Sequence, residues 1–205
     1  MIKPISVLLF LIGLATIGFG QTVTIGKQVW TTQNLDLVRF RNGDLIPEAN
    51  TSAAWKKAGD DKQPAWCYYD NVAANGTKYA KLYNWYAVND PRGLAPAGYH
   101  IPSDAEWTLL TKYLGESSAA KNMKSTSGWE QGGNGTNSSG FTGLPGGYRV
   151  HYGSSYYIVR NGGWWSSSAS NELSAWSRYL VYDDDSVFRG NDDREKGLSV
   201  RCLKD

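Results

Sequence analysis

The sequence predicts a mixed α+β fold that is rich in loops, with two helices packed on a twisted antiparallel sheet. Three observations support this prediction. The 205 residues include nine tryptophans, thirteen tyrosines and twenty-three glycines but only two methionines, so aromatic rings between flexible segments supply much of the core. One segment carries a complete capping signal for a helix. The C-terminal third contains short strand-like runs separated by turn residues.

Residues 1–20 are predicted to be a secretory signal peptide. They contain one cation, Lys3, then an almost unbroken apolar run from Ile5 to Phe19, and small residues around Gly20, where we expect cleavage. Because this run is shorter than the ~20 apolar residues that span a bilayer, no membrane span is predicted. Residues 21–205 are expected to form a single domain that is secreted, periplasmic or held at the cell surface.

The first elements of this domain follow from local patterns. Val23, Ile25, Val29 and Trp30 alternate around a Gly-Lys turn, which predicts a β-hairpin. The next stretch, residues 41–64, is polar and contains glycines and prolines, so we expect a long irregular loop. The segment "AWCYYD" that follows is strand-like.

Two helices are predicted in the middle of the chain. The segment "YAKLYNWYAV", residues 79–88, spaces tyrosine and leucine so that one helical face is aromatic. In "PSDAEWTLLTKYLGE", Ser103 and Glu106 form a capping box, an apolar stripe begins at Trp107, and Gly115 suits a left-handed C-terminal position.

The predicted sheet follows a glycine-rich segment. Between Ser125 and Gly147 glycines alternate with asparagine, serine and threonine, which excludes regular structure and indicates a functional or mobile loop. Strand-like runs come next: "YRVHYGSSYYIV", "GGWWSSSA", "AWSRYLVY", "SVFRG" and "GLSVRCL". We expect them to form a twisted antiparallel sheet.

Charge and cysteine content narrow the function and the compartment. A formal net charge of +2 gives no reason to expect nucleic acid or anionic membrane as a partner. The two cysteines, Cys67 and Cys202, are predicted to form a disulfide, which would close a loop of about 135 residues and contribute on the order of 5 kcal/mol. The alternative is a pair of buried thiols.

The order of several segments resembles a known family. "LYNWYAVNDPRGLAPAGYHIPSDAEWTLL", "GFTGLPGGYR", "WWSSSA", "AWSRYL" and "GLSVRC" are similar to the Fibrobacter succinogenes major paralogous domain, from about residue 23 to residue 205. That family comprises secreted or surface proteins of Fibrobacteres and Bacteroidetes without an established activity. The same order resembles, more distantly, the formylglycine-generating (sulfatase-modifying) enzymes. This second resemblance implies a C-type-lectin-like fold.

Catalysis is not expected. In the resembling enzymes the strand after the Gly-Gly-aromatic stretch holds the oxidising cysteine pair, whereas residues 164–180 here, "WWSSSASNELSAWSRYL", contain no cysteine. Serine neither binds a soft copper ion well nor ionises near neutral pH. His100 and His151 lack a nucleophile motif around them. The carboxylates of Glu106, Glu130, Glu172 and the 183–185 run are not spaced as a catalytic pair.

The aspartate run is the one candidate cofactor site. Asp183, Asp184 and Asp185 supply the hard oxygen ligands that calcium requires, although the interpretation that we favour is a solvated turn between two strands. No other cofactor is expected. Asp185-Ser186-Val187 also resembles the O-glycosylation site of exported Bacteroidetes proteins.

The aromatic residues are the candidate ligand contacts. Adjacent side chains on a strand point to opposite faces, so we expect one of Trp164 and Trp165 to be buried and the other exposed. The exposed ring, together with Trp129, Tyr156 and Trp176, would line a recognition surface. By contrast, Arg149, Arg178 and Arg201, within strand-like runs, are predicted to support the scaffold.

The sequence therefore favours an exported, non-catalytic binding module that presents its glycine-rich loop and an aromatic edge to a glycan or a protein at the cell surface. Two alternatives remain. One is a structural subunit of a surface appendage or envelope assembly, which would show a continuous exposed apolar patch. The other is a diverged enzyme that uses loop carboxylates, which would show converging carboxylates with raised pKa values.

Overall fold

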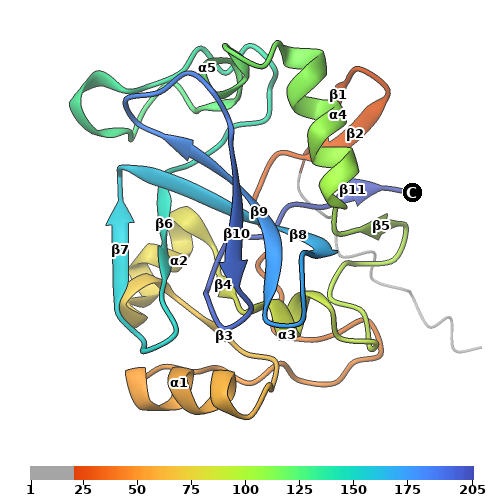
Figure 1. Ribbon diagram of the computed structural model, residues 1–205, viewed down its shortest axis with the longest axis vertical. Coiled ribbons are helices and arrows are strands. Elements are labelled where there is room, and N and C mark those ends of the chain that lie inside the picture. Colours follow the sequence, from red (N-terminus) through yellow and green to blue (C-terminus); the bar gives the residue numbers. More distant parts are fainter. Residues whose placement is uncertain (1–20) are drawn as a thin grey trace, which may run out of the picture.

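The computed structural model describes residues 21–205, and the predicted signal peptide lies outside them. Three sheets and several short helices make up a mixed α+β architecture, as the sequence predicts (Figure 1). No helix among residues 21–205 combines the length and hydropathy needed to cross a bilayer.

The largest sheet occupies the centre of the molecule and has the strand order β10-β9-β8-β6-β7. Its pairs are antiparallel, as predicted, except that β6 and β8 meet in parallel at Gly147 and Gly162. Gly147 has a φ of +65°, and a Cβ there would lie 2.6 Å from the Tyr69 ring, so only glycine fits this crossing. The strands are β6 (Gly146–Arg149), β7 (Ser155–Ile158), β8 (Asn161–Ala169), β9 (Ser174–Val181) and β10 (Phe188–Asp193).

A four-stranded sheet brings the two ends of the described chain together. The predicted hairpin is confirmed as β1 (Thr22–Ile25) and β2 (Gln28–Thr31), and β2 pairs with β11 (Leu203–Lys204), which in turn pairs with β5 (Tyr99–His100). Most of the "GLSVRCL" run is not regular strand. It passes between sheets and makes single bridges to several of them, because it fills the space where they meet.

The capped helix is confirmed as α4 (Asp104–Leu114). The Ser103 hydroxyl accepts a bond from the Glu106 N–H, and the Glu106 carboxylate accepts one from the Ser103 N–H. Gly115 ends the helix with a φ of +85°. The buried face of α4 packs against β8 and β9 (Figure 1).

The predicted helix over residues 79–88 is wrong. Helix α2 (Ala73–Tyr79) ends there, Ala80 has a φ of +62°, and residues 82–83 form strand β4, paired with β3 (Trp66–Cys67). A short helix α3 (Trp85–Val88) follows. Both residues of β4 are buried, and a strand with both faces covered shows the same apolar density as a helical face.

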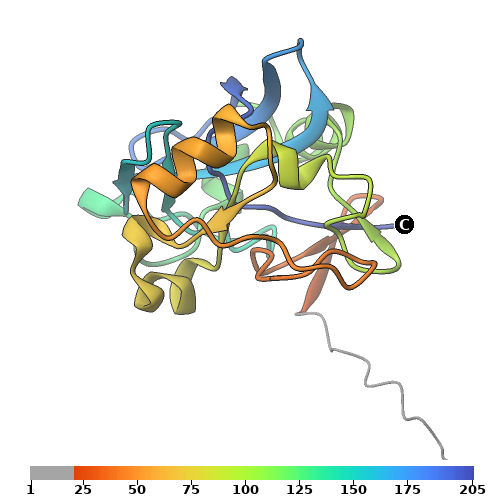
Figure 2. The same cartoon turned by 90° about the horizontal axis from the view of Figure 1, so that it is seen from below.

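The predicted loop over residues 41–64 is also wrong in part, because it contains helix α1 (Ser52–Asp60). The Thr51 hydroxyl caps it by accepting a bond from the Ala54 N–H at 3.0 Å, and Trp55 is its buried anchor. Helix α1 closes one end of the molecule, in front in Figure 2. The glycine-rich segment is confirmed as irregular apart from the 3₁₀ turn η2 (Glu130–Gly132) and the start of β6 at Gly146. The remaining elements are η1 (Tyr69–Asn71) and α5 (Ala119–Met123).

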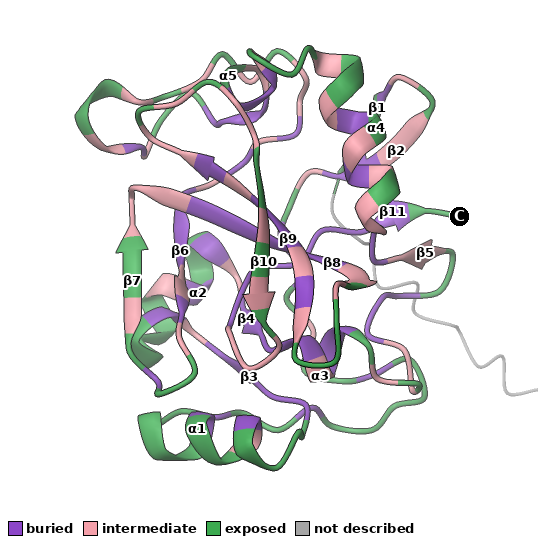
Figure 3. Ribbon diagram, in the orientation of Figure 1, coloured by how far each residue is buried: buried purple, intermediate pink, exposed green. Residues whose placement is uncertain are grey.

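Tryptophan dominates the core on both faces of the central sheet. On one face Trp164 belongs to a cluster with Trp30, Trp107 and Phe141, whose ring centroids lie 4.7–5.8 Å apart. Trp165 packs on the other face. The prediction that Trp164 and Trp165 point to opposite faces of the sheet is therefore confirmed, whereas the prediction that one of the two rings is exposed is wrong. Both rings are buried, because both faces of β8 are covered (Figure 3).

Candidate functional site

Three of the five candidate ligand-binding residues lie in the core. Trp129, Trp164 and Trp165 are each at most 5 % exposed, and each indole N–H donates inside the protein: Trp129 to the Gly143 carbonyl at 3.2 Å, for example. These rings have no face left for a ligand, so their prediction as contacts is wrong. Trp176 is half-buried, and the Arg189 guanidinium lies 3.3 Å from its ring centroid.

Tyr156 is the exposed aromatic candidate, and it belongs to a larger group. We call Tyr148, Tyr152, Tyr156 and Tyr157 the tyrosine surface. Three of them are 40–48 % exposed, and Tyr148 lies half-buried among them, with ring centroids 6.5 Å from Tyr156 and 5.6 Å from Tyr157. The hydroxyls of Tyr152 and Tyr156 are 3.0 Å apart. These four tyrosines thus lie at the β7 edge of the central sheet, and each residue of β7 itself is exposed or half-buried (Figure 3).

The β6–β7 hairpin explains why these rings gather. Tyr148 and Tyr156 are directly opposite across the two strands. Tyr157 would normally point to the other face, but its φ of +62° interrupts the alternation, and its ring centroid lies 6.3 Å from that of Tyr156. Both rings therefore lie beside Tyr148.

The turn of this hairpin is fixed from inside. Buried Arg149 donates from Nε to the Gly153 carbonyl at 3.0 Å and from Nη1 to the Ala49 carbonyl and to Asn71. A Cβ at Gly153 would lie 2.5 Å from the Ser52 backbone, so the turn is packed directly on α1. Arg149 thus has the scaffold role predicted for it, and the tyrosine surface is preformed.

Beside this edge, the glycine-rich segment forms one wall of a polar pocket of about 710 Å³. The pocket is lined by residues 131–134, by Tyr182 and the aspartate run 183–185, and by Lys121 and Lys124. Glu130 N–H donates to the Val159 carbonyl at 2.8 Å, so this wall adjoins the end of β7. A Cβ at Gly133 would lie 2.1 Å from the Tyr182 carbonyl, so the segment is packed in place instead of hanging free.

The aspartate run does not converge as a calcium site. The ammonium of Lys124 occupies its centre, donating to the carbonyls of Val181, Tyr182 and Asp184 at 3.0–3.3 Å. The Asp184 carboxylate accepts from the Ser186 N–H, and Asp185 lies 3.8 Å from Lys124. Residues 21–205 contain no group of three or more histidine, cysteine, aspartate or glutamate side chains suited to a metal ion.

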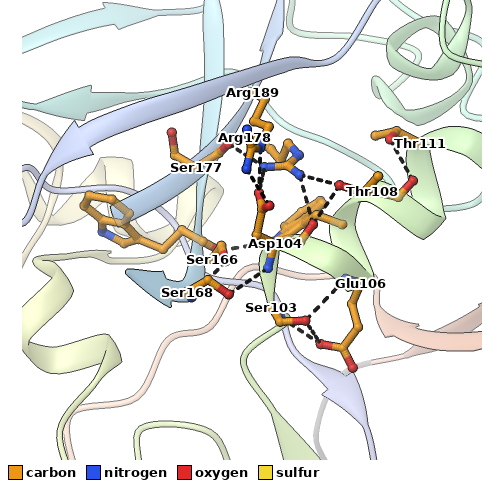
Figure 4. A network of polar contacts seen from close by, with 12 residues as sticks. Ser103, Asp104, Glu106, Thr108, Thr111, Ser166, Ser168, Ser177, Arg178 and Arg189 are labelled. Atoms are coloured by element: carbon orange, nitrogen blue, oxygen red, sulfur yellow. Dashed lines mark hydrogen bonds and ion pairs between the residues drawn. The ribbon is translucent and has the colours of Figure 1, made fainter. Parts of the chain in front are cut away.

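The serine run of β8, Ser166 to Ser168, has a structural role. The Ser166 hydroxyl accepts from the Ser168 N–H at 3.0 Å, and the Ser168 hydroxyl accepts from the Asp104 N–H at 3.1 Å (Figure 4). The Asp104 carboxylate accepts from Arg178 and from Arg189 at 2.7–2.9 Å. Burial opposes the charge of Asp104, but these bonds outweigh it and lower its pKa.

The two histidines lie in different surroundings. His100 is bonded through both ring nitrogens to carboxylates, Glu106 at 3.0 Å and Asp205 at 2.8 Å. Burial opposes its charge, yet these two bonds raise its pKa above the ordinary value. His151 packs edge-on against the Tyr152 ring.

The predicted disulfide is absent. Cys67 and Cys202 are both free and buried, and they belong to different core clusters, the first around Trp55 and the second around Trp165. Burial raises the pKa of the Cys67 thiol to about 11 and that of Cys202 to about 12. The alternative of two buried thiols is the one that the structure shows.

Comparison with models of protein families assigns the chain to one family. The model of the Fibrobacter succinogenes major domain matches residues 23–204. The chain belongs to the Fibrobacter succinogenes major domain family. Searches of curated proteins and of solved structures returned no match. Membership in the family thus confirms the first resemblance, whereas the similarity to formylglycine-generating enzymes and the C-type-lectin-like fold remain predictions.

Sequence reasoning missed three members of the tyrosine surface: Tyr148, Tyr152 and Tyr157. Their signal is present in the run "YRVHYGSSYYIV", where tyrosines flank a Gly-Ser-Ser turn on both arms. Opposing tyrosines across a short hairpin share a face, so the pairing predicts their contact. That this hairpin lies at a sheet edge is visible only in the fold.

Proposed function

We propose that the chain is an exported, non-catalytic binding module that holds a polymeric glycan on its tyrosine surface. The observation that carries this proposal is the grouping of half-exposed tyrosines on a fixed hairpin, in a molecule whose other large rings are mostly buried. Export rests on the predicted signal peptide, and N-terminal sequencing of the protein recovered outside the cytoplasm would locate the cleavage site.

The chemistry of the surface favours a glycan. Tyrosine presents a flat apolar face with a polar hydroxyl at its end, and it loses little conformational entropy on binding. A sugar ring offers the complement, an apolar C–H face bordered by hydroxyls. The neighbouring charge is already engaged: Lys196 lies 3.9 Å from the Tyr148 ring centroid and pairs with Asp192.

The polar pocket beside the glycine-rich segment adjoins the end of β7 and forms the second part of the proposed site. Its lining of amide, carboxylate, ammonium and backbone groups is of the kind that hydrogen-bonds hydroxyls. A glycan chain that stacks on the tyrosines could therefore place a neighbouring sugar in the pocket. In this proposal the aspartate run and the glycine-rich loop hydrogen-bond that second sugar.

The state of the carboxylates supports a non-catalytic function. A glycosidase needs one carboxylic acid with a raised pKa. The carboxylates with a shifted pKa, those of Asp44, Asp90, Asp104 and Glu106, are all shifted downward. Each is held ionised by hydrogen bonds, mostly from arginine, histidine or the backbone.

The test is a glycan array followed by titration of the best polysaccharide into residues 21–205. Tyr156→Ala and Tyr157→Ala are each expected to weaken binding about fivefold to thirtyfold, because truncating a contact ring costs about 1–2 kcal/mol. Tyr113→Ala, which removes an exposed tyrosine on α4, is the matched control and is expected to bind normally. Retained affinity in both β7 variants, or turnover of the glycan, would contradict the proposal.

A subunit of an envelope assembly is the second candidate function. The outer face of α4 exposes Leu109 and Tyr113, 60 % and 67 % accessible, beside Ile25 and the β1–β2 turn. Such a patch favours contact with another protein. Light scattering of the purified domain would distinguish the assembly subunit from the glycan-binding module. Self-assembly of the domain that is lost in the Leu109→Glu variant would favour the assembly subunit.

A further inference from the structure

A second hollow, away from the tyrosine surface, combines an apolar floor with one unpaired cation. It has a volume of about 330 Å³, at the small end of ligand-binding pockets. Its floor consists of Val88, Leu94, Ala95 and Ile101, each at most 7 % exposed. Such a floor fits the apolar face of a small molecule.

Arg41 at the rim is fixed by backbone carbonyls. Its Nε donates to the Ala95 carbonyl at 3.0 Å, and its Nη2 donates to the carbonyls of Pro96 and Tyr99 at 3.4 and 3.1 Å. These bonds set the plane of the guanidinium without neutralising it. Within residues 21–205, no carboxylate pairs with Arg41, and its Nη1 donates to no acceptor. Arg92, by contrast, is paired with two aspartates.

The acidic group in the hollow is already satisfied. Glu106 accepts from the Ser103 N–H at 2.8 Å, from the Ser103 hydroxyl at 2.7 Å, and lies 3.0 Å from His100 Nε2. The Glu106 carboxylate therefore already has its hydrogen-bond partners without Arg41. Ser167 of β8 also lines the hollow, and its hydroxyl has no hydrogen bond to any residue of the described range 21–205.

We propose that this hollow binds the carboxylate of a small organic acid, with Arg41 and Ser167 contacting the anion and the apolar floor supporting the body of the acid. The Nη1 group of a guanidinium held in a fixed plane can donate a charge-assisted hydrogen bond to one oxygen of a carboxylate. The carboxylate has two sources of equal chemistry, a uronic acid unit of a glycan or a free organic acid. The site shares no residue with the tyrosine surface and does not depend on it.

The experiment is an NMR titration of ¹⁵N-labelled residues 21–205 with glucuronate, glucose and benzoate. Glucuronate is expected to shift the backbone signals of Leu94, Ile101 and Ser167, while glucose, which has no carboxylate, leaves them in place. Shifts with glucuronate alone identify a uronic acid site, and shifts with both acids identify a general carboxylate site. Equal shifts with glucose, or none with either acid, would overturn the proposal.

Two arginine variants make the test specific. Arg41→Gln is expected to weaken acid binding about tenfold or more, because it removes a charged hydrogen-bond donor. Arg39→Gln is the matched control, since Arg39 is exposed on the same segment and its side chain, within residues 21–205, hydrogen-bonds only to the Gly43 carbonyl. Equal affinity in the two variants would contradict the role of Arg41. If Arg41→Gln disturbs the fold, Ser167→Ala tests the same site, with a smaller expected loss.

The tyrosine variants separate this inference from the proposed function. Tyr156→Ala is expected to bind glucuronate as the unaltered protein does. If the unaltered protein binds glucuronate but no polysaccharide, the proposed function fails and the Arg41 site stands. If it binds polysaccharide but not glucuronate, the Arg41 site fails and the proposed function stands.

Discussion

The central sheet carries two adjacent aromatic pairs, Trp164-Trp165 on β8 and Tyr156-Tyr157 on β7, and their environments are opposite. The tryptophans alternate across a central strand and are buried on both faces. The tyrosines lie on an edge strand, where a positive φ at Tyr157 brings both rings beside Tyr148. Strand position, more than residue type, separates the aromatic residues that stabilise the protein from those available to a ligand.

The largest expected effect comes from the interior pair. Trp165→Ala is expected to lower the free energy of unfolding by about 3–5 kcal/mol, because it leaves a large cavity in a fully buried site. Urea denaturation followed by circular dichroism measures it. Trp176→Ala, at a half-buried ring stacked with Arg189, is the control and should cost only about 1 kcal/mol. If Trp165→Ala lowered the free energy of unfolding no more than Trp176→Ala does, the claim that the buried rings stabilise the protein more than the exposed ones would be contradicted.

A smaller loss is expected at Asp104, which ties α4 to the strands around the interior pair. Asp104→Asn should cost about 2–4 kcal/mol, because buried Arg178 loses its anionic partner. The folded pKa of Asp104 is below its ordinary value of 3.8, so its contribution is present above that pH and lost as the pH falls through the folded pKa.

Acid denaturation midpoints measure this dependence. As the pH falls below 4, the Asp104→Asn variant is expected to lose less of its free energy of unfolding than the unaltered protein does. Asp193→Asn, which replaces an exposed carboxylate on β10, is the control and is expected to follow the unaltered protein. Parallel acid profiles for all three proteins would show that the network does not link the helix to the sheet.

His100 provides a weaker, pH-dependent link at the surface. Its folded pKa is raised above 6.5, so its stabilising effect is fully present below that pH and lost as the pH rises through the folded value. His100→Gln is expected to flatten this slope in thermal unfolding measured from pH 5.5 to 8.5, with a small effect because the site is partly exposed. His151→Gln, at a histidine beside the tyrosine surface, should leave the slope unchanged; the reverse ranking would refute the assignment.

No effect is expected from reducing agent. Because Cys67 and Cys202 are free and lie in different clusters, dithiothreitol should leave the thermal midpoint unaltered, and both thiols should react with a thiol reagent only after unfolding. A marked loss of stability on reduction would mean that a disulfide, not aromatic packing, holds the interior together.

Local signals in the sequence predicted the local structure well. The first hairpin and the capped helix α4 are fixed by neighbouring residues, and both are found as predicted. The helix expected over residues 79–88 fails because a buried strand and a helical face have similar apolar content. The expected exposure of one ring of Trp164 and Trp165 and the pairing of Cys67 with Cys202 fail for another reason. They depend on which distant segments cover a strand, and no local pattern contains that information.

The candidate site shows the same division. The sequence indicates an aromatic edge and names Tyr156, which is exposed, but it predicts a functional or mobile glycine-rich loop, and that segment is packed against Tyr182. The remaining tyrosines and the hollow at Arg41 depend on the sheet order and on contacts between residues far apart in the chain.

The most direct test of the central claim is an NMR titration of the domain with the polysaccharide that binds best, observing aromatic signals. The ring signals of Tyr156 and Tyr157 are expected to shift, while the indole N–H signals of Trp164 and Trp165 stay in place. Shifted indole signals with unchanged tyrosine rings would contradict the claim that edge tyrosines bind the ligand and buried tryptophans support the fold.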